Sequence, residues 1–284
     1  MIREADFMKT KTLKKILVYL VLLAALVIFL FPVYWMVISA FRHNNGLMQR
    51  PLNFKPTFDT FQNMAAVLSN GKYLRFIKNS LIVSAGTMLS CVVLSLMAGY
   101  ALSRYRFPFR KTIMSTLLSV QMFPTVAILI TLYTFFVQFK LTNTYLGLIL
   151  ACLCVSLPLS VWMMKSFFDT IPVSLDEAAK IDGCGRFQTL VDVILPMMKP
   201  GIYAVGIYSF LMAWDDFVFS KVLINVNDKK TLTVGIAESF LGEFSHNYAG
   251  MMALAVVAAL PIVIIFIVFQ KFLISGMTAG AVKE

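Results

Sequence analysis

The chain has 284 residues, of which 59% are hydrophobic and only 14% carry a charge. Soluble domains contain about 25% charged residues, so this composition excludes an ordinary soluble protein and indicates one embedded in a lipid bilayer. The formal net charge of +11 could suggest a nucleic-acid partner. Basic residues collect on the cytoplasmic loops of membrane proteins, however, and we interpret the charge in that way, with no nucleic acid bound.

Six segments are apolar and long enough to cross a membrane, for which about 20 residues are needed. Five are uncharged runs, at 16–40, 79–103, 112–139, 141–164 and 247–270. The sixth begins at Pro200 and is interrupted only by Asp215 and Asp216. The first run is too long for the core of a signal peptide and lacks a cleavage site, so we expect it to be retained. The sequence therefore predicts an all-α membrane protein with six transmembrane helices.

Six crossings divide the chain into a basic N-terminus at 1–15, a transmembrane domain at 16–273 and a C-terminal tail at 274–284. Both termini then lie on one side, which carries most of the 25 basic residues. This distribution indicates that both termini are cytoplasmic. A polar loop at 170–200 interrupts the apolar spans on the same side.

Shorter features are expected between the spans. Residues 41–78 are predicted to form an external segment with helix-like apolar spacing at 58–68, and a tight turn is predicted at 140–143. Three prolines lie inside predicted spans, where they can bend a helix: Pro124, Pro158 and Pro261.

The polar loop contains the pattern of a short, capped helix. Ser174 stands three residues before Glu177, which is the spacing of a capping box, and Asp176 adds a favourable charge to the first turn. Gly183 suits the left-handed position that ends a helix. We therefore expect a rigid helix held across the cytoplasmic mouth of the protein.

Two adjacent alanines, Ala178 and Ala179, are expected to leave one face of this helix low enough for another protein to approach closely. A second helix or turn is expected at 187–194, and Leu195-Pro196 should close the loop before the fifth span begins at Pro200.

The spacing of Glu177-Ala178-Ala179, Gly183 and Leu195-Pro196 resembles the signature loop of the membrane subunits of binding-protein-dependent ABC importers. Further segments at 78–80, 104–108, 213–217 and 270–283 are similar to the carbohydrate subgroup, and in particular to the smaller membrane subunit of the maltose transporter. The resemblance covers roughly residues 12–284. Three positions depart from the family pattern: Phe109 replaces a glycine, Val193 an isoleucine and Asp215 an asparagine. The change at Phe109 suggests a different turn there.

The resemblance implies a type I ABC importer permease fold and a non-enzymatic subunit in a bacterial or archaeal cell membrane. Such a subunit forms half of a translocation pathway for a sugar, in particular an oligosaccharide. Its implied partners are a second homologous permease in a heterodimer, two ABC ATPase subunits and an extracytoplasmic solute-binding protein. The chain contains no GxxxxGK[ST] phosphate loop, so ATP and magnesium are expected on the ATPase subunits, with no cofactor bound by this chain.

The resemblance also implies two contacts with the ATPase. The first is a coupling helix and its flanking loop, comprising Glu177, Ala178, Ala179, Asp182, Gly183, Leu195 and Pro196. The second is the tail, where the candidates are Gly276, Thr278, Gly280 and Lys283.

Other functions remain open from the sequence. A permease of the same family could carry a polyol, a glycerophosphodiester or an amino acid. An ion-gradient transporter would need ionisable groups at the centres of its spans, and only the fifth span comes near this. An intramembrane protease would need a nucleophile motif or two separated aspartates, which the chain lacks.

The predicted spans contain few polar residues that could line a pathway, act as an acid or base, or bind a metal. Gln121, Trp214 and Asp215 are weak candidates for lining the pathway, because lone polar residues in spans usually bond to a neighbouring helix. Asp215 and Asp216 point about 100° apart on a helix, so they make a poor acid–base pair. The two histidines lie in outer loops without metal-ligand spacing, so no metal site is expected. The four cysteines are interpreted as small packing residues.

Overall fold

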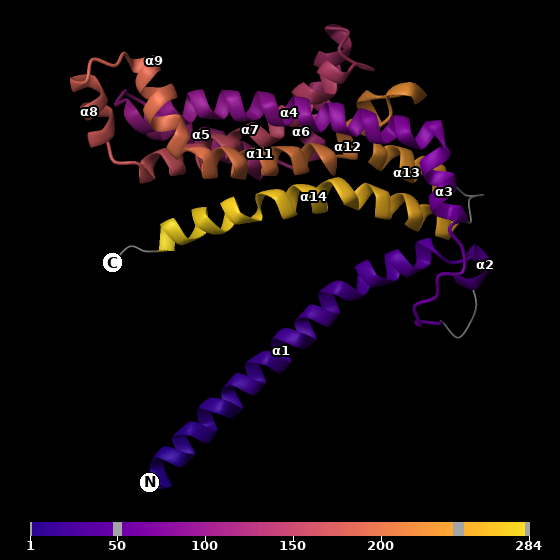
Figure 1. Ribbon diagram of the computed structural model, residues 1–284. Helices are drawn as coiled ribbons and strands as arrows, with labels where there is room; N and C mark the ends of the chain where they lie inside the picture. Colours follow the sequence, from indigo (N-terminus) through magenta and orange to yellow (C-terminus); the bar gives the residue numbers. More distant parts are fainter. Residues whose placement is uncertain (1, 48–52, 241–246, 282–284) are drawn as a thin grey trace. The chain divides into compact units, whose positions relative to one another are not determined.

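The computed structural model describes residues 2–47, 53–240 and 247–281, with side chains described for 14–47, 53–240 and 247–270. Within these ranges the chain is helical and contains no β-strand (Figure 1). It divides into two compact units. One combines the N-terminal part up to Ser69 with residues 240–257, and the other combines residues 70–239 with the part from Ala258 onward.

The first unit is built on the long helix α1 (Ile2–Ala40) and also contains α2 (Asn44–Leu47) and α3 (Gln62–Ser69). Arg42 follows α1 and is only 3% exposed. Its guanidinium donates hydrogen bonds to the Thr57 hydroxyl and to the carbonyls of Asn53 and Lys55. The buried guanidinium of Arg42 therefore holds the segment at 53–57 against the end of α1. The helix α3 confirms the helical spacing predicted at 58–68.

The second unit contains the remaining helices, and its core is formed by α4, α7 and α11. In chain order its elements are α4 (Gly71–Arg104), α5 (Arg110–Ser119), η1 (Val120–Met122), α6 (Thr125–Gln138), α7 (Tyr145–Thr170), α8 (Ser174–Ile181), α9 (Arg186–Gln188), η2 (Thr189–Ile194), α10 (Leu195–Met197), α11 (Lys199–Trp214), α12 (Val218–Leu223), η3 (Asn227–Lys229) and α13 (Leu232–Phe240), followed by the later part of α14 (Tyr248–Ala281).

Small residues allow α4 to approach its neighbours closely. Thr87, Cys91, Ser95 and Gly99 recur every four residues on the buried face of α4. A Cβ atom at Gly99 would lie 3.0 Å from the backbone nitrogen of Lys165 in α7, so glycine is needed for this approach. The Cys91 thiol donates a hydrogen bond to the Ser160 hydroxyl across the same interface. Small residues and interhelical hydrogen bonds are the means by which helices associate in lipid.

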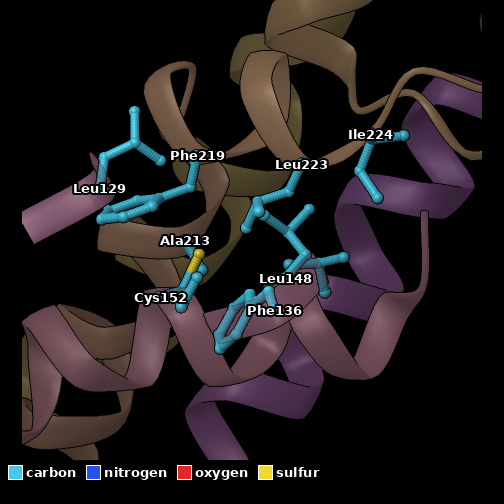
Figure 2. Close-up of a cluster of buried hydrophobic side chains, with 10 residues drawn as sticks. Leu129, Phe136, Leu148, Cys152, Ala213, Phe219, Leu223 and Ile224 are labelled. Carbon is cyan, nitrogen blue, oxygen red and sulfur yellow. The ribbon is translucent and has the colours of Figure 1, made fainter. Parts of the chain in front are cut away.

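At one end of the second unit, apolar side chains from α6, α7, α11 and α12 form a buried cluster (Figure 2). Phe136 from α6 and Leu148 from α7 pack with Leu223 and Ile224 at the end of α12. The cluster joins the shorter helices that follow α11 to the long helices of the core.

Among the described residues, four helices are long and apolar enough to cross a membrane, at 14–40, 71–104, 145–170 and 248–270. Two bent pairs, 110–122 with 125–138 and 186–197 with 199–214, bring the total to six if each pair is one span. The predicted all-α membrane architecture is confirmed.

The predicted span at 112–139 is a bent pair of helices, and the bend lies at Pro124, one of the prolines predicted to bend a helix. The chain bends by 100° between η1 and α6. Phe123 is extended, with φ −80° and ψ 138°, because the ring of Pro124 disfavours a helical conformation in the residue before it. Pro124 also lacks the N–H that would continue the helix. By contrast, α7 and α14 run through Pro158 and Pro261 without a break.

Both ends of the chain extend the terminal spans as helix. The basic segment before residue 16 belongs to α1, and α14 runs from the last span to Ala281. The expected turn at 140–143 is present, since Lys140 and Asn143 both have positive φ angles.

Phe109, which stands where the family pattern has glycine, keeps a glycine-like backbone. Its φ is 63° and its side chain is 75% exposed. A non-glycine residue in this left-handed conformation is strained by about 1–2 kcal/mol. The change of residue has therefore not removed the conformation that glycine favours.

We expect Phe109→Gly to stabilise the protein by about 0.5–1 kcal/mol, because relief of the strain exceeds the extra backbone entropy of glycine. Thermal unfolding of the purified protein in detergent would measure this. Phe107→Gly is the control, since Phe107 does not have a positive φ and its replacement should give no gain. Equal or lower stability of Phe109→Gly would contradict the prediction.

Candidate functional site

The first helix of the polar loop, α8, begins without the predicted capping box. Val173 already has helical angles, so Ser174 lies inside the helix and no side chain caps it. A capping residue must itself be non-helical. The first amides bond instead to backbone carbonyls: Leu175 N–H donates to Pro172 O, and Asp176 N–H to Val173 O. The capping-box prediction is therefore wrong.

The end of α8 confirms the prediction for Gly183. Its φ is +84°, its N–H donates to the Lys180 carbonyl at 3.1 Å, and the Cys184 N–H donates to the Ala179 carbonyl at 2.9 Å. These two bonds form a Schellman motif. A Cβ atom at Gly183 would meet nothing within 4 Å, so the requirement for glycine is conformational and not steric.

The two alanines of α8 do not form one face. Ala179 is buried, whereas Ala178 is exposed beside Glu177 and Ile181. The expectation of a low face made by both alanines is wrong, because adjacent residues point about 100° apart on a helix.

The exposed surface of the loop carries several large apolar side chains that the sequence pattern did not single out, and two of them are the most exposed. Ile181 is 86% exposed on α8, and Phe187 is 79% exposed on α9. Large apolar residues within a polar loop were the signal that could have identified them. Together with Glu177 and Ala178, they form what we call the outer face of the loop.

The second half of the loop is helical, as expected at 187–194, but it runs further. It comprises α9, the π-helix η2 and α10. Leu195-Pro196 does not close the loop; it opens α10, and the chain bends by 78° before α11. Pro196 is tolerated there because it lies in the first turn.

Buried apolar residues seat the loop on the core. Ile194 and Met198 are both at most 1% exposed and pack with Met164 and Phe168 of α7. The loop that exposes the outer face is therefore packed against α7 on its opposite side.

Asp176 does more than contribute charge to the first turn of α8. It is 7% exposed, and its Oδ2 lies 2.9 Å from Nε of Arg104 at the end of α4. Arg104 belongs to the segment at 104–108 that was singled out only for its resemblance to the carbohydrate subgroup. A local pattern carries no signal of this pair, because the two residues are 72 positions apart.

At the opposite end of the second unit, a cavity of about 390 Å³ is lined by side chains from α7, α11 and the segment after α11. Asp215 and Tyr208 lie in its wall, with Thr125 from α6. Asp215 is thus one pathway candidate that the structure places on a cavity.

The other polar candidates at this end have structural partners. Trp214 is 3% exposed and stacks on Phe210, with ring centroids 5.6 Å apart. The Gln121 amide donates to the Val155 carbonyl at 2.8 Å. Asp216 accepts hydrogen bonds from the amides of Phe219 and Ser220 and thereby caps α12. Neither Trp214 nor Gln121 is in the wall of the cavity.

The remaining site predictions fall where less is described. Gly276, Thr278 and Gly280 lie in α14, in the part whose side chains are not described, and Lys283 lies outside the described residues. In the described part of the chain, no group of three or more His, Cys, Asp or Glu residues could hold a metal ion.

Asn79 binds the segment at 224–232 to the core helix α4. Its amide nitrogen donates to the carbonyls of Asp228 and Lys230, both at 2.9 Å, and its oxygen accepts from the Tyr145 hydroxyl at 2.8 Å. The neighbouring Ser80 accepts from the Leu232 amide. The sequence motif at 78–80 thus has a structural role that the sequence alone did not reveal.

We expect Asn79→Asp to destabilise the protein by about 2 kcal/mol or more, because a carboxylate cannot donate to the two carbonyls and would be buried beside them. Thermal unfolding in detergent measures the loss. The control is Arg75→Gln, which removes an exposed ion pair with Asp228 and should change stability by less than about 0.5 kcal/mol. Equal effects of the two changes would contradict the assignment.

We expect Gly183→Ala to destabilise the end of α8 by about 1 kcal/mol, because alanine is strained in the left-handed conformation. Hydrogen exchange of the α8 amides would report the local opening. Gly185→Ala is a matched control: Gly185 has φ −69° and equal space around it, so its replacement should leave exchange unchanged. Equal protection in both variants would disprove the conformational requirement.

Comparison with known proteins places this arrangement in a family. The model of the family "Binding-protein-dependent transport system inner membrane component" matches residues 91–279. The chain is 34% identical to the trehalose/maltose transport system permease protein MalG of Thermococcus litoralis, over 97% of this chain and 99% of that protein. It is 33% identical to the sulfoquinovosyl glycerol transport system permease protein SmoH of Agrobacterium fabrum, over 89% of each.

A solved structure has the same fold. A chain of a bacterial ABC transporter that imports the acidic polysaccharide alginate superimposes with a TM-score of 0.81, at 19% identity, over 93% of this chain and 98% of that one. The family match covers the last part of α4, all of α7, the signature loop and α11, and most of α14. The chain therefore belongs to the family of binding-protein-dependent transport system inner membrane components.

Proposed function

We propose that the chain is one half of the translocation pathway of an ATP-driven sugar importer, and that the outer face of its signature loop docks on an ATPase subunit. The observation that carries the docking proposal is the exposure of Ile181 and Phe187 on a loop whose inner side is firmly packed. Apolar side chains exposed in this way mark interaction sites. A helix ended by a Schellman motif presents them on a rigid support.

The proposed assembly contains a second homologous permease, two ATPase subunits and a solute-binding protein outside the cell. The chain contains no GxxxxGK[ST] phosphate loop, so ATP and magnesium are assigned to the ATPase subunits. Docking on a cytoplasmic ATPase requires the signature loop to face the cytoplasm. With six spans, both termini then face the same side.

We assign the substrate to the sugars, in particular to oligosaccharides. The relatives named above are described as carriers of trehalose or maltose and of a sulfoquinovosyl glycoside, and the chain matches both over most of its length. The cavity beside Asp215 and Tyr208 is where this subunit would contact the solute. Its polar groups could bond hydroxyls, and its aromatic wall includes Phe217 and Phe219.

We expect Ile181→Asp to reduce the ATPase retained on the purified complex at least about tenfold, because a central apolar contact contributes 1.4 kcal/mol or more to such an interface. Glu177→Lys should act in the same direction. Both variants should insert in the membrane normally, since both side chains are exposed. Co-purification of the subunits and sugar uptake by proteoliposomes are the measurements.

Val226→Asp is the matched control. It also replaces an exposed apolar side chain with a carboxylate, but it lies between α12 and η3, at the opposite end of the second unit. It should leave ATPase retention unchanged. Full retention and full uptake in both the Ile181 and Glu177 variants would overturn the docking assignment. Screening the binding protein against sugars, polyols and amino acids would test the substrate class separately.

A further inference from the structure

We propose that the buried pair of Arg104 and Asp176 is a tether that passes movement of the coupling helix α8 to α4. This inference rests on the proposed function, in which an ATPase moves α8. Chain connectivity links the loop only to α7 and α11. The third core helix, α4, ends at Arg104 and receives movement from the loop only through non-covalent contacts.

Arg104 holds two parts of the loop at once. Its Nε lies 2.9 Å from Asp176 Oδ2 on α8, and its Nη2 donates to the carbonyl of Ile171, which links α7 to α8, at 3.0 Å. The two charged side chains are only 7% and 10% exposed. A pair so shielded from solvent is little weakened by salt.

Tyrosines on both sides of Arg104 extend the contact. The Tyr100 hydroxyl lies 3.5 Å from Asp176 Oδ1, and its ring packs edge-on against Phe168 of α7. The Tyr105 ring lies under the guanidinium of Arg186 in α9, 5.7 Å away. The end of α4 therefore contacts both halves of the loop, and the ion pair joins two oppositely charged side chains there.

The chemistry of the pair favours a positioning role over a stabilising one. A buried ion pair is often no more stable than apolar residues of similar size, because removing two charges from water offsets their attraction. Apolar residues could fill the space but would allow α8 to slide over α4. Attraction between two buried opposite charges favours the one register of the two helices in which they are in contact.

The test uses the complete complex in proteoliposomes, with ATPase subunits and binding protein, and measures sugar imported per ATP hydrolysed. The apolar double variant Arg104→Met/Asp176→Leu leaves no unpaired charge. It should assemble and hydrolyse ATP, but the amount of sugar imported per ATP should fall at least about fivefold. A factor of about five is the lower end of the effects that coupling between two sites usually produces. The reversed pair Arg104→Asp/Asp176→Arg should recover at least half of the lost coupling.

The matched control is Arg75→Met/Asp228→Leu, which makes the same two replacements in an exposed ion pair between the start of α4 and η3. It should leave import per ATP unchanged within about twofold, because that pair does not touch the loop. Unchanged coupling in the apolar variant would overturn the tether. So would a reversed pair that behaves like the apolar one, or failure of both variants to assemble, since the pair would then serve folding alone. A wild-type complex that does not assemble or import would instead refute the proposed function.

Discussion

In a bilayer every backbone N–H and C=O must find a partner within the protein, because no water is available to bond it. This constraint explains why the described chain is helical and why its breaks are so few. It also explains where polar side chains occur. The Asn143 side chain accepts hydrogen bonds from the amides of Asn225 and Val226, and Asp216 caps α12. The Asn79 side chain donates hydrogen bonds to two backbone carbonyls of the segment at 224–232. Each satisfies backbone groups where a helix has ended.

The same constraint shapes the core. Helices in lipid gain nothing from hiding apolar side chains from one another, so they associate through close packing and hydrogen bonds. The small residues of α4, ending in Gly99, bring its backbone against α7. The two ends of the second unit are held by different contacts. At one end Asn79 bonds two backbone carbonyls, beside the ion pairs of Arg75 and Glu238, and at the other end Arg104 pairs with the buried Asp176.

The sequence predicted those features that depend on neighbouring residues. Apolar runs predicted the long helices, and Gly183 predicted the end of α8, since its conformation follows from the residue itself. The capping box failed because Val173 was already helical, which depends on how the chain leaves α7. The alanine face failed because burial of one side of α8 decides which alanine points outward. Pro124 was named as a residue that can bend its helix, but the sequence could not show that it breaks the helix while Pro158 and Pro261 do not, because proline within a membrane helix can also be tolerated without a break.

The candidate sites divide in the same way. The sequence by itself determined the membrane setting, the helical class and the position of the signature loop, because hydrophobicity and turn chemistry are local properties. Only the tertiary structure decided that Asp215 and Asp216 both line a cavity, that Asp216 also caps α12, and that Ile181 and Phe187 are exposed. The ion pair of Arg104 and Asp176 was also visible only in the tertiary structure. The physical reason is that ion pairs, cavities and exposed faces arise where helices distant in the chain meet, and no local pattern records which helices those will be.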